Sequence, residues 1–137
     1  NIPFNDEQSF IDSFENSITP KTRVIFLSHI TSPTGLIFPV SEICKMAKKH
    51  NILSIIDGAH VPGHIPMDIS ALDADIYIGA CHKWMCTPKG VSFLYCRRDL
   101  QSLIEPLVVS WGWESDLCSL WRCGLSCYSW IDSEGSR

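Results

Sequence analysis

Short apolar runs of strand type recur along the chain, and polar residues lie at or directly after the end of each of the first three. The runs cover residues 24–27, 52–57, 75–80 and 91–96, and they are rich in Val, Ile, Phe and Tyr, as β-strands are. Segments with helical spacing of apolar side chains lie between the first three runs. This alternation predicts an α/β fold with a mostly parallel sheet and flanking helices, in which ligands bind beyond the carboxyl ends of the strands. The continuous apolar runs at 24–27 and 52–57 predict buried strands.

Four segments carry helix signals. Apolar side chains recur at helical spacing over residues 7–17 and 41–50, and the second segment ends in basic residues that favour the helix dipole. A short helix is predicted over residues 68–72, and Asp99 is predicted to cap a helix that runs toward Ile104. The first three of these predicted helices can flank the sheet.

The composition is that of one ordinary globular domain. The 137 residues are 45% hydrophobic and 19% charged, with a formal net charge of -4, so nothing favours nucleic-acid binding. The apolar runs fall far short of the roughly 20 residues that cross a bilayer, so no membrane partner is expected. Seven cysteines at irregular spacing, in a chain without a secretory signal, favour free thiols and a cytoplasmic location.

Polar side chains that could take part in binding or catalysis follow the predicted strands. Asp57 ends the second strand and precedes Gly58-Ala59-His60, while the third strand leads into His82 and Lys83. The loop after the first strand holds Thr31 and Ser32. The carboxyl ends of parallel strands lie at the same edge of a sheet, so these side chains are expected to meet there.

Four segments carry a specific resemblance. They are SHITSPTG at 28–35, DGAH at 57–60, ADIYIGACHKW at 74–84 and PKGVSFLY at 88–95. In order and spacing they resemble the class V aminotransferases, most closely their isopenicillin N epimerase-like branch, and the likeness covers most of residues 20–113. It implies that residues 1–116 are part of the large domain of a pyridoxal-phosphate-dependent transferase fold. The Cys- and Trp-rich tail at 117–137 resembles nothing in the family, and a frameshifted or mispredicted end is the favoured interpretation.

The resemblance assigns a role to each candidate residue. It implies that Lys83 forms the Schiff base with pyridoxal 5'-phosphate, and that Asp57 pairs with the pyridine nitrogen of the cofactor. His60 would contact the phenolic oxygen of the ring, His82 would lie near the phosphate, and Ser32 or its neighbour Thr31 would contact the cofactor or the substrate. The ring serves as an electron sink for a carbanion beside the substrate nitrogen, and a cationic pyridinium deepens the sink.

The same resemblance implies the kind of reaction. The substrate is a small amino acid or amine, and the reaction is of epimerase, aminotransferase or desulfurase/lyase type. The family's phosphate-binding loop lies before Asn1 and its small domain lies after residue 137, so the chain is expected to act as part of a longer enzyme, in the family's usual homodimer. The absence of an initiator Met agrees with a piece of a longer chain.

Two rival interpretations stay open. Ala80 stands where family members usually have Ser or Asn that reaches the phosphate, and this favours a noncatalytic remnant of the fold that binds no cofactor. A cysteine-rich zinc module is the other rival, but the cysteines lack paired Cys-x-x-Cys spacing. Pro62-Gly63 rules out a helix that would align His60 and His64, so no metal site is predicted. Taken alone, Asp57 would be a cap for the following loop and Lys83 a surface lysine.

Overall fold

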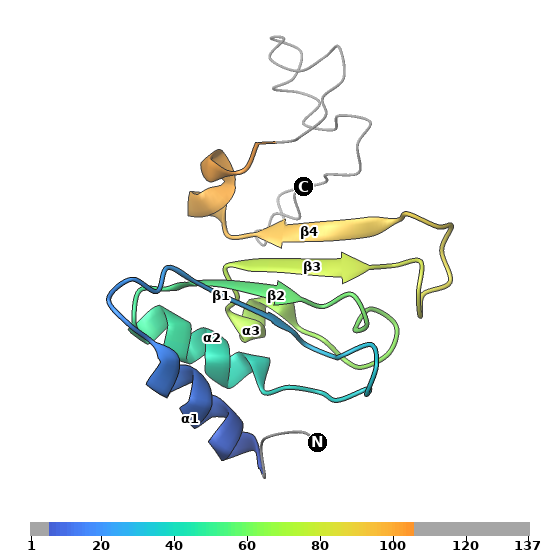
Figure 1. Ribbon diagram of the computed structural model, residues 1–137. Helices are drawn as coiled ribbons and strands as arrows, with labels where there is room; N and C mark the ends of the chain where they lie inside the picture. The colour runs from blue at the N-terminus through green and yellow to red at the C-terminus, as the bar shows by residue number, and fades with distance from the viewer. Residues whose placement is uncertain (1–5, 106–137) are drawn as a thin grey trace, which may run out of the picture.

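A four-stranded sheet with helices on one face forms the protein (Figure 1). The computed structural model describes residues 6–105. In chain order the elements are α1 (Glu7–Ser17), β1 (Val24–Ser28), α2 (Val40–Lys49), β2 (Leu53–Asp57), α3 (Ile69–Leu72), β3 (Ile76–Ala80), β4 (Ser92–Cys96) and the 3-10 helix η1 (Arg98–Leu103). The strand order is β1-β2-β3-β4, with the first three parallel and β4 antiparallel to β3. The predicted α/β class is confirmed. The predicted tail at 117–137 lies outside the described residues.

The helices form where the sequence predicts them. Asp6 caps α1 by accepting a hydrogen bond from the Ser9 backbone N–H, and the Ser9 hydroxyl accepts one from the Asp6 N–H. Helix α2 begins directly after Pro39, one residue before the predicted start. Helix α2 packs on the sheet against β2, and α1 packs against α2. The core they share includes Phe10, Val40, Ile43, Ala47, Ile25, Leu27, Ile56 and Tyr77.

The prediction that β1 is a buried strand is wrong on one face. Burial alternates along β1, with Ile25 and Leu27 toward the helices, whereas Phe26 is 61% exposed. Ile78 of β3 is also exposed. No element among residues 6–105 covers this second face enough to bury Phe26, which explains why an apolar run does not give a strand buried on both sides.

The segment after β4 also differs from the prediction. It forms a helix as predicted, the 3-10 helix η1, but Arg97 and not Asp99 occupies the N-cap position, without a side-chain capping bond. Asp99 lies within the turn, where its carboxylate accepts hydrogen bonds from the Arg97 guanidinium. The favourable charge pairing therefore replaces the predicted capping role of Asp99.

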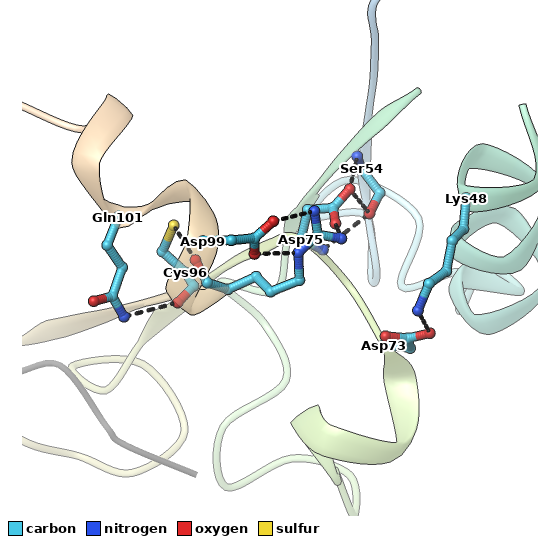
Figure 2. A network of polar contacts seen from close by, with 8 residues as sticks. Lys48, Ser54, Asp73, Asp75, Cys96, Asp99 and Gln101 are labelled. Carbon is cyan, nitrogen blue, oxygen red and sulfur yellow. Dashed lines mark hydrogen bonds and ion pairs between the residues drawn. The ribbon is translucent and has the colours of Figure 1, made fainter. Parts of the chain in front are cut away.

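A polar network joins β2, β3 and η1 at the amino end of β3 (Figure 2). The buried carboxylate of Asp75 accepts hydrogen bonds from the Ser54 backbone N–H at 2.8 Å and from the Ser54 hydroxyl at 3.1 Å. Its other oxygen accepts from the Arg97 guanidinium, which also binds Asp99. The network fixes this end of the sheet, and the candidate site lies at the opposite, carboxyl end.

Asp75→Ala is expected to lower the free energy of unfolding by about 2–4 kcal/mol, because it leaves the buried Ser54 donors and Arg97 without their acceptor. Urea unfolding followed by circular dichroism measures the loss. The control is Lys48→Ala, which removes an exposed ion pair with Asp73 and is expected to cost less than about 1 kcal/mol. Equal losses in the two variants would contradict a structural role for the network.

Candidate active site

The carboxyl ends of β2 and β3 bring the two halves of the site together. Asp57 is the last residue of β2, and its backbone carbonyl accepts a hydrogen bond from the His29 N–H at 2.8 Å. The next residue, Gly58, donates its N–H to the carbonyl of Ile78 on β3 at 2.8 Å. The chain beyond β2 is thus held between the ends of the two neighbouring strands, where ligands bind in open α/β sheets.

Lys83 and His60 are in direct contact. Lys83 lies in the loop between β3 and β4, and its Nζ is 2.9 Å from Nε2 of His60. Desolvation and, secondarily, the positive charge of Lys83 lower the pKa of His60, while Asp57 opposes this shift. The imidazole is therefore neutral near neutral pH, and its Nε2 accepts a hydrogen bond from Lys83. The structure brings these two predicted site residues together although 23 positions separate them.

The carboxylate of Asp57 is held by two neutral donors. Oδ1 accepts from the Ala59 backbone N–H at 3.0 Å, and Oδ2 accepts from the Ser28 hydroxyl at 3.4 Å. Within residues 6–105, no ion pair joins Asp57 to a basic side chain. Asp57 does cap the loop that follows it, which is the role expected for this residue when it is considered alone. The cap leaves the carboxylate charge without a cationic partner in the part of the chain that the structure describes.

A hydrogen-bonded pair next to this turn, formed by the buried Tyr77 and the half-buried His29, was not predicted from the sequence. Tyr77 of β3 is fully buried, and its hydroxyl is hydrogen-bonded to Nδ1 of His29 at 3.1 Å. Burial and the nearby Asp57 charge raise the pKa of Tyr77, and burial lowers the pKa of His29, so both side chains are neutral. A Cβ at Gly58 would lie 2.1 Å from the Tyr77 ring. Glycine directly after Asp57 is the one signal of this close approach.

The remaining candidates lie in less direct positions. Nδ1 of His82 is hydrogen-bonded to the Val91 carbonyl at 3.1 Å, which ties the Lys83 loop to the start of β4. Ser32 is exposed in the loop after β1, where the neighbouring Thr31 hydroxyl is bonded to that of Thr34. Among residues 6–105, no hydrogen bond joins Ser32 to Lys83 or Asp57.

The described residues give no support to the alternative of a metal site at His60 and His64. Nδ1 of His64 is hydrogen-bonded to the His60 carbonyl at 3.0 Å, and the His64 ring stacks on Trp84 with centroids 4.4 Å apart. Residues 6–105 hold no cluster of three or more His, Cys, Asp or Glu side chains suited to a metal ion. Within the same range, no helix is both long and apolar enough to span a bilayer.

Comparisons with known proteins agree on one family. Residues 1–115 match the family described as aminotransferase class-V. The chain is 36% identical to isopenicillin N epimerase of Amycolatopsis lactamdurans over 83% of its length, and 43% identical to that of Streptomyces clavuligerus over 69%. It covers only 29% and 24% of those two proteins.

A solved structure gives the same answer for the fold. The cystine C-S lyase C-DES, solved with its reaction product cysteine persulfide, has a TM-score of 0.69 and 34% identity, covering 74% of this chain and 28% of C-DES. A mutant of C-DES has been solved with glycine covalently linked to its PLP cofactor. The resemblance noted in the sequence is confirmed, and the chain belongs to the aminotransferase class-V family.

Proposed function

We propose that this chain carries the catalytic lysine and the cofactor-binding aspartate of a pyridoxal-phosphate-dependent enzyme that acts on an amino acid or amine. The observation that carries the proposal is the contact of Lys83 with His60, three residues after Asp57, at the shared carboxyl edge of β2 and β3. Family membership and the PLP-bound C-DES neighbour support pyridoxal 5'-phosphate as the cofactor. The predicted cofactor is thus confirmed at the level of the family.

The donor set at this edge fits the cofactor. A primary amine, a carboxylate with no cationic partner among residues 6–105 and a neutral imidazole suit an aldehyde, a pyridine nitrogen and a phenolic oxygen, respectively. Lys83 would hold the aldehyde, Asp57 the nitrogen and His60 the phenolic oxygen. His82 is proposed to lie near the phosphate and Ser32 near the cofactor or substrate. Ala80 offers no hydroxyl or amide for the phosphate, so other residues must supply that contact.

When bound, pyridoxal phosphate supplies an electron-withdrawing ring that stabilises negative charge at the α-carbon of an amino acid. The chain's own residues handle the proton. Lys83 Nζ takes the proton from the α-carbon as a general base and returns it as an acid. His60 orients Nζ through its hydrogen bond, and the Asp57 carboxylate stabilises the proton on the cofactor nitrogen by its negative charge.

The reaction subtype is proposed to be epimerase, aminotransferase or desulfurase/lyase. The isopenicillin N epimerases and the C-S lyase C-DES support the first and the last of these. The enzyme is proposed to act as a homodimer in the cytoplasm. The four cysteines that the structure describes, Cys44, Cys81, Cys86 and Cys96, are free thiols, as expected in a reducing compartment.

A cofactor titration separates this proposal from a noncatalytic remnant. Adding pyridoxal phosphate to the complete protein is expected to give an absorption band of bound cofactor that changes again when an amino acid substrate is added. The band arises because the lysine amine and the carboxylate bind the cofactor in a defined environment. A spectrum equal to the sum of protein and free cofactor would support the remnant.

A further inference from the structure

Ser28 and Asp57 occupy matched positions on neighbouring strands. They are register partners in the parallel pairing of β1 with β2, and each is the last residue of its strand. Ser28 follows the exposed Val24 and Phe26 in the alternation of β1, so its side chain lies on the face away from the helices. Asp57 pairs with the exposed Ile78 on the same face. The two side chains are therefore neighbours by strand geometry.

The contact between them reaches the carboxylate itself. The Ser28 hydroxyl donates to Oδ2 at 3.4 Å, while the Ala59 N–H donates to Oδ1 at 3.0 Å. One donor comes from β1 and the other from the turn after β2, so the two oxygens are held from different sides. Backbone bonding reinforces this arrangement, because the His29 N–H donates to the Asp57 carbonyl at 2.8 Å.

Hydroxyl donation matters here because Asp57 has no ion pair within residues 6–105. A carboxylate bound by a single donor is free to rotate about its Cβ–Cγ bond, whereas donors on both oxygens fix its plane. Ser28 thus acts on the orientation of the Asp57 carboxylate.

We propose that Ser28 is a positioning residue for the reaction, which holds the Asp57 carboxylate in the plane that the cofactor nitrogen requires. This inference rests on the proposed function, since it gives Ser28 a task only if Asp57 faces the cofactor. Ser28 itself acts through Asp57 and is not assigned contact with the reacting atoms.

A double-mutant cycle in the complete enzyme tests the proposal. Ser28→Ala is expected to lower turnover about fivefold, the size expected for loss of one ordinary hydrogen bond, because the Ser28–Asp57 contact is long at 3.4 Å. It is also expected to shift the absorption maximum of bound pyridoxal phosphate in the same direction as Asp57→Ala does. Ser28→Thr keeps the hydroxyl and should restore both values. In the Asp57→Ala background, Ser28→Ala should change neither turnover nor spectrum, because its acceptor is gone.

Controls separate positioning from folding. Ser92→Ala, at an exposed strand position of β4, should leave turnover and spectrum unchanged, and thermal melting shows whether all variants are folded. An equal effect of Ser28→Ala with and without Asp57, or no effect on the spectrum, would overturn the positioning role while leaving the proposed function intact. Failure of the unsubstituted enzyme to bind pyridoxal phosphate would overturn both.

Discussion

Lys83→Ala in the complete enzyme is expected to slow exchange of the substrate α-proton by at least about 10³-fold. General acid–base catalysis alone contributes about 10²–10⁴-fold, and alanine has no group that can take or return the proton. The substitution also removes the amine that would hold the cofactor aldehyde covalently. Loss of the α-proton signal of an amino acid in deuterated water, followed by NMR, measures the exchange rate.

Lys89 is the matched control for this substitution. It has the same side chain and is exposed in the turn that leads into β4, six positions beyond Lys83. Lys89→Ala is expected to keep exchange within about twofold of the unsubstituted enzyme, because exposed surface substitutions have small effects. A large loss with Lys89→Ala and none with Lys83→Ala would reassign the catalytic lysine.

Asp57→Asn is expected to lower turnover on the order of 10²-fold or more, with a much smaller loss of cofactor occupancy. The charge that stabilises a protonated ring nitrogen disappears, and preorganised charges of this kind are worth about 10²–10³-fold. Asparagine keeps an oxygen that can accept from the Ala59 N–H and so preserves the turn. Steady-state kinetics together with the ratio of bound cofactor to protein measure the two effects.

Asp68→Asn is the control, because it changes an aspartate whose expected role is only to cap a helix. Asp68 accepts a hydrogen bond from the Ala71 N–H at 3.0 Å and caps α3, so its amide replacement should leave turnover unchanged. If Asp57→Asn behaves like Asp68→Asn, then Asp57 is a structural cap and its proposed catalytic charge is wrong.

The local elements were predictable because each depends on neighbouring residues. The helical spacing around Phe10 and Phe14 gives α1 with its predicted bounds, and the β-branched runs give the strands within a residue or so at each end. The parallel arrangement follows from the alternation of strands and helices. The predicted edge location of Lys83 and Asp57 follows from their places at strand ends.

Long-range side-chain contacts were not predictable from local pattern. His29 and Tyr77 are 48 positions apart, and Ser28 lies 29 positions before Asp57. Their contacts depend on strand order and register, which only the folded sheet defines. The exposure of Phe26 was also not predictable, because an apolar run does not indicate which elements cover each face of the strand.

Residues after β4 show a different cause of error. Asp99 is of a residue type that is preferred at helix N-caps, yet the guanidinium of Arg97, two positions earlier, binds its carboxylate. The Arg97 backbone N–H also donates to the Asp75 carbonyl at 2.8 Å, and its guanidinium bonds the Asp75 carboxylate. Tertiary bonding at one residue therefore overrode a local capping preference, which is a weak signal by itself.

Lys83 is the residue proposed to bind pyridoxal phosphate covalently. Borohydride reduction of the complete enzyme with its cofactor, followed by proteolysis and mass spectrometry, tests this directly. One reduced adduct is expected, on the peptide that contains Cys81-His82-Lys83-Trp84, and none is expected on Lys89. An adduct on Lys89, or bound cofactor without an adduct on either lysine, would contradict this role of Lys83.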